Sequence, residues 1–254
     1  MAKLVTTQID KRGVARVTVN NAAKLNSLSS EAALALVAAM QRVGDTPGLR
    51  VVVLSGAGEK AFVGGANIDE LGALDPASAR AFITRLHDAC ASMRDCPVPV
   101  IARVNGWCLG AGLELAAACD FRIASGNAMF GMPEVHLGIP SVIEAALLPR
   151  LIGAGRARWL VLTGQTINAE EALRWGFLER VVPPAELDRE VDAAVDAIVK
   201  NHDGATRTQK RLQKAYEDLP LSETVRLSID EFARSYESGE PREIIGEFLR
   251  RRRK

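Results

Sequence analysis

The segment from Val98 to Ala118 constrains the fold more than any other part of the chain. Residues 98–104 are apolar apart from Pro99 and Arg103, which is typical of a buried strand. Glycines follow at positions 106, 110 and 112, and the apolar run that they lead into predicts a helix over Gly112–Ala118. A buried strand, a tight glycine-rich turn and a buried helix in succession favour an α/β fold.

The predicted helix carries one carboxylate, Glu114, and a second carboxylate, Glu134, follows twenty residues later in the weakly polar stretch MPEV. Burial of a lone carboxylate costs on the order of several kcal/mol unless it is paired, protonated or hydrogen-bonded. Two such groups therefore indicate shifted pKa values and acid–base chemistry. Taken separately, each has a structural alternative: Glu114 could cap a buried backbone group, and Glu134 could serve a turn or a helix start after Pro133.

The rest of the chain supports the α/β class and indicates two regions. Leu4–Ile9 and Val14–Val19 flank a turn signal and predict a hairpin. Strand signals at residues 51–54, 100–104 and 121–124 then alternate with helix signals at residues 31–43, 76–95 and 112–118, which predicts stacked β-β-α units. Ser29 or Ser30 can cap the first of these helices.

After about Pro183 only helix signals remain, over residues 185–200, 204–217, 221–237 and 242–251. We therefore predict an α/β core over residues 1–190 and a helical C-terminal region over residues 191–254.

Charge and cysteine usage narrow the function classes. The formal net charge is +1, and the one basic cluster is the C-terminal run 250–254, so we expect neither a nucleic acid nor a membrane as a partner. That run fits a solvated helix end, with contact to a phosphate-bearing ligand as the alternative. The three histidines are scattered, so no histidine-based metal site is expected.

The cysteines at positions 90, 96, 108 and 119 form no C-x-x-C pair and stand among apolar or small residues. They are typical of buried thiols in a reducing compartment. Because the N-terminus shows no targeting pattern and no run of about eighteen apolar residues could span a bilayer, we expect a cytoplasmic protein.

Two loops, Gly56–Leu71 and Gly106–Gly112, lead into predicted helices, where backbone N–H groups without partners favour an anion. One N–H from each loop could hold a single oxygen as negative charge develops on it, which is an oxyanion hole. The glycines alone favour the alternative, in which they simply allow the chain to turn. Their spacing does not match a dinucleotide-binding fingerprint, because no acidic residue stands at the right place after a following strand.

Four motifs occur in order along the chain: AFVGGANIDEL, NGWCLGAGLELAAACD, FGMPEVHLGIP and LTGQTINAEEALRWGFLERVV. Together they resemble the crotonase, or enoyl-CoA hydratase/isomerase, superfamily over nearly the whole chain. The resemblance implies a crotonase-type spiral of β-β-α units that binds acyl-CoA, and a helical trimerisation region. It also implies that the protein assembles as a homotrimer, or as a homohexamer that is a dimer of trimers. No cofactor is implied, because coenzyme A is part of the substrate.

The resemblance assigns chemical roles to particular positions. The backbone N–H groups that bind the thioester carbonyl match Ala66 and Ala111. The acids that hold the reacting water match Glu114, as the base toward water, and Glu134, as the acid toward the α-carbon. These matches imply reversible hydration of a 2-enoyl-CoA to a 3-hydroxyacyl-CoA. The alternatives are an isomerase, another lyase or a hydrolase acting on a CoA thioester, or a silent protein that binds acyl-CoA or a protein partner.

The same comparison indicates binding residues. Lys60, Val63, Gly64 and Ala66 match positions that bind coenzyme A, although Lys60 fits an ordinary surface lysine equally well. Leu71, Trp107 and Ser141 are expected to border the acyl pocket, with core packing as the alternative for the first two.

Three departures from the family pattern stand out. Asn67 replaces an aspartate after Ala66, and Asp69 stands where relatives often have a basic residue. Ser141–Glu144 replaces a glycine-rich turn that would wall the acyl pocket, so the departure bears on substrate choice. Glu144 adds a third acid, which we expect to be a solvated residue at a helix start.

Overall fold

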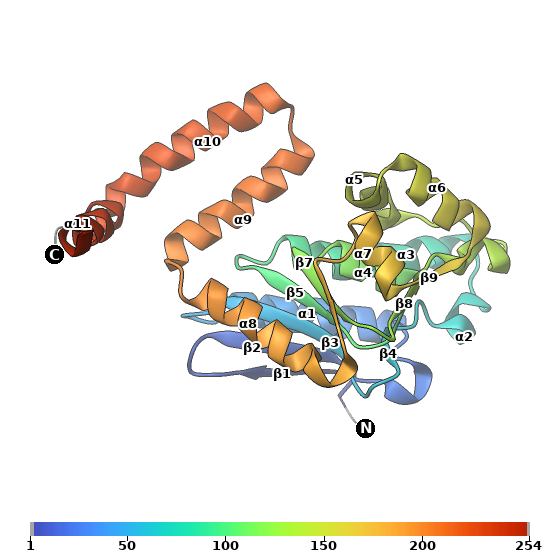
Figure 1. Ribbon diagram of the computed structural model, residues 1–254. Coiled ribbons are helices and arrows are strands. Elements are labelled where there is room, and N and C mark those ends of the chain that lie inside the picture. The colour runs from blue at the N-terminus through green and yellow to red at the C-terminus, as the bar shows by residue number, and fades with distance from the viewer. Residues whose placement is uncertain (1–2, 253–254) are drawn as a thin grey trace. The chain divides into compact units, whose positions relative to one another are not determined.

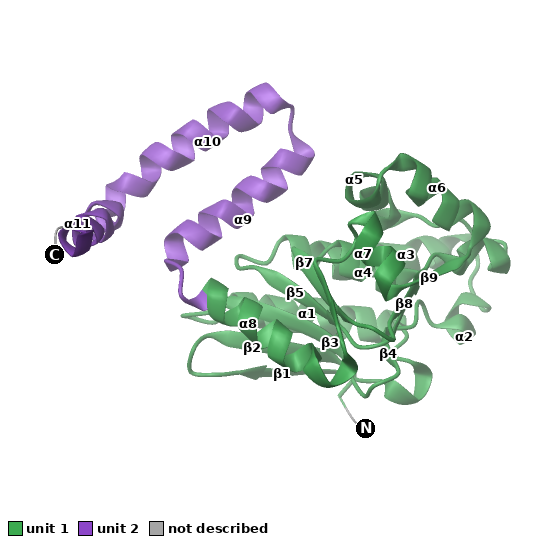
Figure 2. Ribbon diagram, viewed as in Figure 1, with its two compact units in different colours: residues 1–198 green, residues 199–254 purple. Residues whose placement is uncertain are grey.

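The computed structural model describes residues 3–252 and separates into two compact units, residues 1–198 and residues 199–254 (Figure 2). The first unit contains all the strands and the second is helical. The predicted boundary at residue 190 falls inside α8 (Leu187–Val199). All of this helix except its last residue, Val199, belongs to the first unit.

The first unit is built on a six-stranded sheet with the order β1-β2-β3-β5-β7-β10 (Figure 1). The hairpin of β1 (Val5–Ile9) and β2 (Val14–Val19) is antiparallel, as predicted. The remaining strands run parallel to their neighbours: β3 (Val51–Gly56), β5 (Val100–Val104), β7 (Phe121–Ser125) and β10 (Arg180–Val182).

A second sheet of four strands has the order β4-β6-β8-β9. Each strand has three residues: β4 (Ala61–Val63), β6 (Trp107–Leu109), β8 (Met129–Gly131) and β9 (Thr166–Asn168). These strands were not predicted from the sequence. Three of them follow a long strand of the first sheet within a few residues, so the chain forms the predicted β-β-α turns.

Helices of the first unit begin where the local sequence favours it. Ser29 caps α1 (Ser30–Gly44) by accepting a hydrogen bond from the Ala32 N–H at 3.2 Å, as predicted. Asp75 and Ser78 form a reciprocal capping box at the start of α3 (Pro76–Arg94). The other helices are α2 (Ile68–Leu71), α4 (Ala111–Ala117), α5 (Leu148–Ile152), α6 (Ala154–Thr163) and α7 (Ala169–Trp175). Short 3-10 helices are η1 (Ala22–Lys24), η2 (Pro133–Leu137), η3 (Ile143–Leu147) and η4 (Pro184–Glu186).

One face of the six-stranded sheet forms the core. Along β2, Val17 and Val19 are buried in the core together with Leu36 of α1 and Leu86 of α3. The four cysteines are buried and free, as predicted. Burial of this apolar surface is the main stabilising contribution of the unit.

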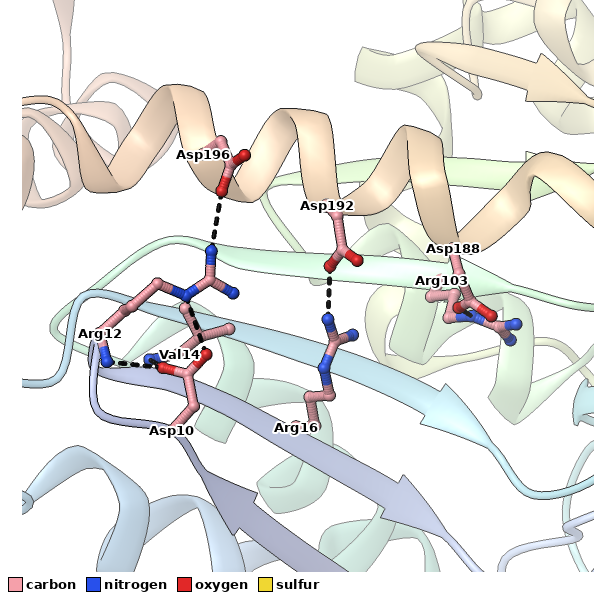
Figure 3. A network of polar contacts seen from close by, with 8 residues as sticks. All are labelled: Asp10, Arg12, Val14, Arg16, Arg103, Asp188, Asp192 and Asp196. Atoms are coloured by element: carbon pink, nitrogen blue, oxygen red, sulfur yellow. Dashed lines mark hydrogen bonds and ion pairs between the residues drawn. The ribbon is translucent and has the colours of Figure 1, made fainter.

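The opposite face of this sheet is polar and is covered by α8 (Figure 3). Asp188, Asp192 and Asp196 recur every four residues and so lie on one side of the helix. They pair in turn with Arg103 of β5, Arg16 of β2 and Arg12 in the hairpin turn. Ion pairs this exposed to solvent contribute little to stability, so they orient α8 more than they stabilise the unit.

The second unit contains α9 (Asp203–Asp218), α10 (Leu221–Ser235), the 3-10 helix η5 (Tyr236–Ser238) and α11 (Glu240–Arg252), close to the predicted helices. Arg211 of α9 and Arg234 both pair with Glu231 of α10. Of the basic C-terminal run, residues 253 and 254 lie outside the described residues. Within residues 3–252, no helix combines the length and the apolar character needed to cross a membrane.

Candidate active site

Two glycine-rich loops meet beside the four-stranded sheet. Because β4 and β6 pair in parallel, the residues that follow them leave the sheet at the same edge. A Cβ atom built on Gly65 would lie 3.4 Å from the Leu109 carbonyl oxygen, and one built on Gly112 would lie 2.0 Å from the Val63 carbonyl oxygen. Glycine at position 112 is therefore required for the start of α4 to approach β4 this closely.

This approach places two backbone N–H groups at one cavity. Ala111 is the first residue of α4, and an α-helix leaves its first N–H groups without intrahelical acceptors. Ala66 lies on the other loop, and Leu28, which precedes α1, bonds to both of its neighbours. The Leu28 N–H donates to the Gly65 carbonyl at 2.9 Å, and the Leu28 carbonyl accepts from the Asn67 N–H at 2.8 Å. In extended backbone the Ala66 N–H then points away from Leu28. Ala66 and Ala111 both line a cavity of about 90 Å³.

Glu114 enters this cavity from α4. Its side chain is 4% exposed, and its Oε1 accepts a hydrogen bond from the Ala145 N–H at 3.1 Å. Its pKa is raised to about 8: burial has the largest effect, the negative charge of Glu134 adds to it, and the Ala145 N–H offsets part of the increase.

Glu134 enters the same cavity from η2. Its Oε2 accepts a hydrogen bond from the Ser141 hydroxyl at 2.8 Å. Partial burial raises the pKa of Glu134, while its own backbone N–H and Ser141 lower it. Like charges that face one cavity disfavour a doubly ionised pair, and burial favours the proton on Glu114.

The cavity opens along apolar walls into a larger groove of about 840 Å³. Residues that line both are Ile68, Leu71, Phe82, Ile83, Leu137, Ile139, Pro140 and Val142. A polar inner end with apolar walls suits a ligand that carries a reactive polar group on a hydrocarbon chain.

The structure brings most of the predicted site residues together. The cavity is lined by Gly64, Ala66, Leu71, Ala111, Glu114, Glu134 and Ser141. Val63 lies within β4 with its side chain in the core, and Lys60 is exposed just before that strand. Trp107 lies on β6 with an exposed fraction of 39% and lines neither of the two cavities, so its place at the acyl pocket stays a prediction.

The expectation of a solvated Glu144 is wrong. Its side chain is 5% exposed, and its Oε1 lies 2.9 Å from Nδ1 of His87. The reason is that η3 packs against both α3 and α4, so Glu144 in its first turn is buried. The other two departures lie at α2: Asn67 caps this helix, and Asp69 in its first turn pairs with Lys24 at 2.7 Å.

The apolar walls that α3 supplies to the cavity were not predicted from the sequence. Phe82, Ile83 and Leu86 line the inner cavity. They recur on one helix face, and that periodicity was available in the sequence. Periodicity does not distinguish a cavity wall from the core, because both require apolar side chains.

The chain resembles known proteins over nearly its full length. A family profile described as enoyl-CoA hydratase/isomerase matches residues 10–254. The crotonyl-CoA hydratase of Syntrophomonas wolfei is 35% identical over 236 residues, covering 92% of this chain and 91% of that protein. The short-chain-enoyl-CoA hydratase of Clostridium acetobutylicum is 34% identical over 247 residues, covering 96% of this chain and 95% of that protein.

Solved structures show the same likeness. An enoyl-CoA hydratase from Mycobacterium smegmatis matches with a TM-score of 0.94 at 28% identity, covering 98% of this chain and 96% of that one. An enoyl-CoA hydratase from Bacillus anthracis matches with a TM-score of 0.86 at 32% identity, covering 91% of this chain and 90% of that one.

Proposed function

The chain belongs to the enoyl-CoA hydratase/isomerase family, and from this premise we propose that it hydrates the double bond of a 2-enoyl-CoA thioester reversibly, giving a 3-hydroxyacyl-CoA. The predicted family and crotonase-type fold are confirmed. One observation carries the proposal: two carboxyl groups, Glu114 and Glu134, line the same cavity as Ala66 and Ala111. The hydratase names of the relatives support it.

The two N–H groups act on the thioester carbonyl. As water adds to the β-carbon, electrons move through the α-carbon onto the carbonyl oxygen, which becomes an enolate oxygen. Donation from Ala66 and Ala111 stabilises this charge, and loss of one such donor costs about 10²–10³ in rate in well-studied enzymes.

The two carboxyl groups move the protons. Glu114 as carboxylate removes a proton from water while the resulting hydroxyl bonds to the β-carbon. Glu134 as carboxylic acid then gives its proton to the α-carbon, and the enolate returns to a thioester carbonyl. Each transfer is general acid–base catalysis, which contributes about 10²–10⁴ in rate.

Hydration requires one proton on the pair, and the electrostatics of the site support that state. Burial favours Glu114 as the protonated member of the free pair, whereas the assigned roles need the proton on Glu134. Because the two groups titrate as a unit, the proton can move between them. We propose that it moves from Glu114 to Glu134 when the thioester and water bind.

The coenzyme A moiety is proposed to bind at Lys60, Val63, Gly64 and Ala66, with the Lys60 ammonium near phosphate. Leu71, Ser141 and Trp107 are proposed to border the acyl group. No metal or redox cofactor is needed, because the amides and the carboxyl groups supply the charge stabilisation and proton transfers of hydration.

We also propose a homotrimer, or a dimer of trimers, formed through the second unit. Leu221, Val225, Ile229 and Phe232 recur along one side of α10, and each is at least 49% exposed. An apolar stripe of this kind needs a partner surface. The buried free cysteines support a reducing compartment, and we propose the cytoplasm.

A panel of 2-enoyl-CoA esters of different chain length tests the function. We expect loss of the conjugated-thioester absorbance with wild-type protein, and 3-hydroxyacyl-CoA as the product. Migration of the double bond, or release of free coenzyme A without hydration, would assign another reaction to the site.

A further inference from the structure

Glu144 is a third carboxylate near the two acids, and the proposed mechanism does not use it. Its Oε1 lies 2.9 Å from Nδ1 of His87, which is half-exposed on α3. Its Oε2 is buried without a nitrogen or oxygen donor among residues 3–252, and the neutral Cys90 thiol hydrogen-bonds to the Glu144 side chain.

The short helix that carries Glu144 also holds Glu114. Ala145, the next residue of η3, donates its N–H to Oε1 of Glu114 at 3.1 Å. A chain of contacts therefore runs from His87 through Glu144 and the backbone of η3 to Glu114. A shift of η3 away from α3 would remove the hydrogen bond from the Ala145 N–H to the Glu114 carboxyl group.

The charges along this chain of contacts are coupled. His87 and Cys90 of α3 and Glu114 of α4 face Glu144, while α5 contributes Arg150, which is exposed. Burial and the Glu144 charge both raise the pKa of the Cys90 thiol, which stays neutral and cannot offset that charge. The Glu144 charge raises the pKa of Glu114, after the larger effects of burial and Glu134.

We propose that Glu144 is a positioning residue for Glu114. Held by His87, Glu144 fixes η3 so that the Ala145 N–H stays on the Glu114 carboxyl group. The negative charge of Glu144 also lets the acid pair keep its proton to a higher pH. This inference rests on the proposed function, because it takes Glu114 to be a reacting group.

Two substitutions separate the hydrogen bond from the charge. Glu144→Gln keeps an oxygen acceptor for His87 but removes the charge, whereas Glu144→Ala removes both. With crotonyl-CoA as the probe, we expect Glu144→Ala to lower kcat roughly 10- to 100-fold with KM unchanged, because the misplaced group acts only in the reaction step. Glu144→Gln should retain most of kcat, with the basic limb of its pH profile moved to lower pH.

Substitutions at His87 test the other end of the chain of contacts. His87→Ala should lower kcat in the same way as Glu144→Ala, and His87→Asn, whose amide can replace the Nδ1 donor, should restore much of it. Glu170→Gln, at an exposed position in the first turn of α7, is the matched control and should leave kcat and the pH profile unchanged.

A titration that does not depend on turnover makes the test independent of the proposed function. The carboxyl ¹³C signal of Glu114, identified by its loss in Glu114→Gln, should titrate at lower pH in Glu144→Gln than in wild type. If Glu144→Ala does not fold, Glu144→Gln, which keeps the side-chain volume, carries the test.

An unmoved Glu114 midpoint in Glu144→Gln, or wild-type kcat in a folded Glu144→Ala, would overturn the inference. A wild-type protein that hydrates none of the enoyl-CoA esters would overturn the proposed function instead, and the ¹³C titration would still decide whether Glu144 and Glu114 are coupled.

Discussion

Gly110 and Glu134 are in direct contact across the cavity. A Cβ atom built on Gly110 would lie 2.2 Å from Oε1 of Glu134. Gly110 also has φ +50° and ψ −120°, a backbone conformation that other residues rarely adopt. The loop that presents the Ala111 N–H thus reaches the acid only because position 110 has no side chain.

Gly110→Ala should therefore inactivate the site. The added methyl group must displace Glu134 or the loop, and the strained backbone costs on the order of 1–3 kcal/mol. We expect kcat with crotonyl-CoA to fall by about 10²-fold or more, as for a misplaced reacting group. Gly155→Ala is the matched control, since a Cβ atom there meets nothing within 4 Å. Near-wild-type kcat in a folded Gly110→Ala protein would contradict the contact.

Glu114→Gln and Glu134→Gln should each lower kcat by roughly 10²–10⁴, because each amide preserves shape but transfers no proton. Binding of butyryl-CoA, a saturated thioester, should change little in isothermal titration calorimetry. Glu31→Gln, at an exposed position in the first turn of α1, serves as the control. Full activity in either active-site variant would remove that residue from the mechanism.

The pH dependence of kcat/KM should be bell-shaped. Hydration needs one proton on the acid pair, and kcat/KM reports the ionisation of the free enzyme. Activity should fall above about pH 8, where the acid pair loses its proton, and again at low pH, where the pair takes up a second proton. A profile that stays flat well above pH 8 would show that the proton on the pair is not required.

Glu114 should also make the protein less stable as pH rises. Its pKa is about 8 in the folded protein and near the ordinary glutamate value of 4.5 in the unfolded chain. Between these values the folded state binds more protons than the unfolded state, so the free energy of unfolding falls with rising pH. At pH 8, urea unfolding should show Glu114→Gln to be more stable than wild type by roughly 2–4 kcal/mol, an advantage that disappears near pH 4.5. An equal gain at both pH values would point to packing instead.

Ile229→Asp should weaken the proposed assembly, because it places a charge in the apolar stripe of α10. Light scattering should give a trimer or hexamer mass for wild type and a lower mass for the variant. Asp230→Ala, an exposed neighbour on another side of the helix, should leave the mass unchanged. A monomeric wild type, or an Ile229→Asp protein that assembles normally, would contradict the interface.

The sequence predicted those elements whose signals are local. Val14–Val19 alternates between buried and more exposed residues, and Ser29 stands directly before a helical apolar pattern, so both were recognised. The three-residue strands have no such local signal. Ala61 pairs with Trp107, far along the chain, and this pairing depends on tertiary contacts alone.

The site, like the fold, could be predicted only where the signal is local in the sequence. Glu114 and Glu134 stand out as carboxylates in apolar surroundings, but their roles came from the family resemblance. Glu144 was misplaced because IEAAL has the appearance of an exposed helix start, and only the packing of η3 on α3 and α4 buries it. Tertiary packing overrode a reasonable local expectation.

The central claim is that a thioester carbonyl binds between the Ala66 and Ala111 N–H groups while Glu114 and Glu134 flank the reacting carbons. A crystal structure with 3-hydroxybutyryl-CoA measures this directly. We expect the thioester oxygen to lie about 3 Å from both backbone nitrogens and the 3-hydroxyl group to lie between the two carboxyl groups. A thioester oxygen away from these N–H groups, or a hydroxyl group out of reach of both acids, would contradict the account.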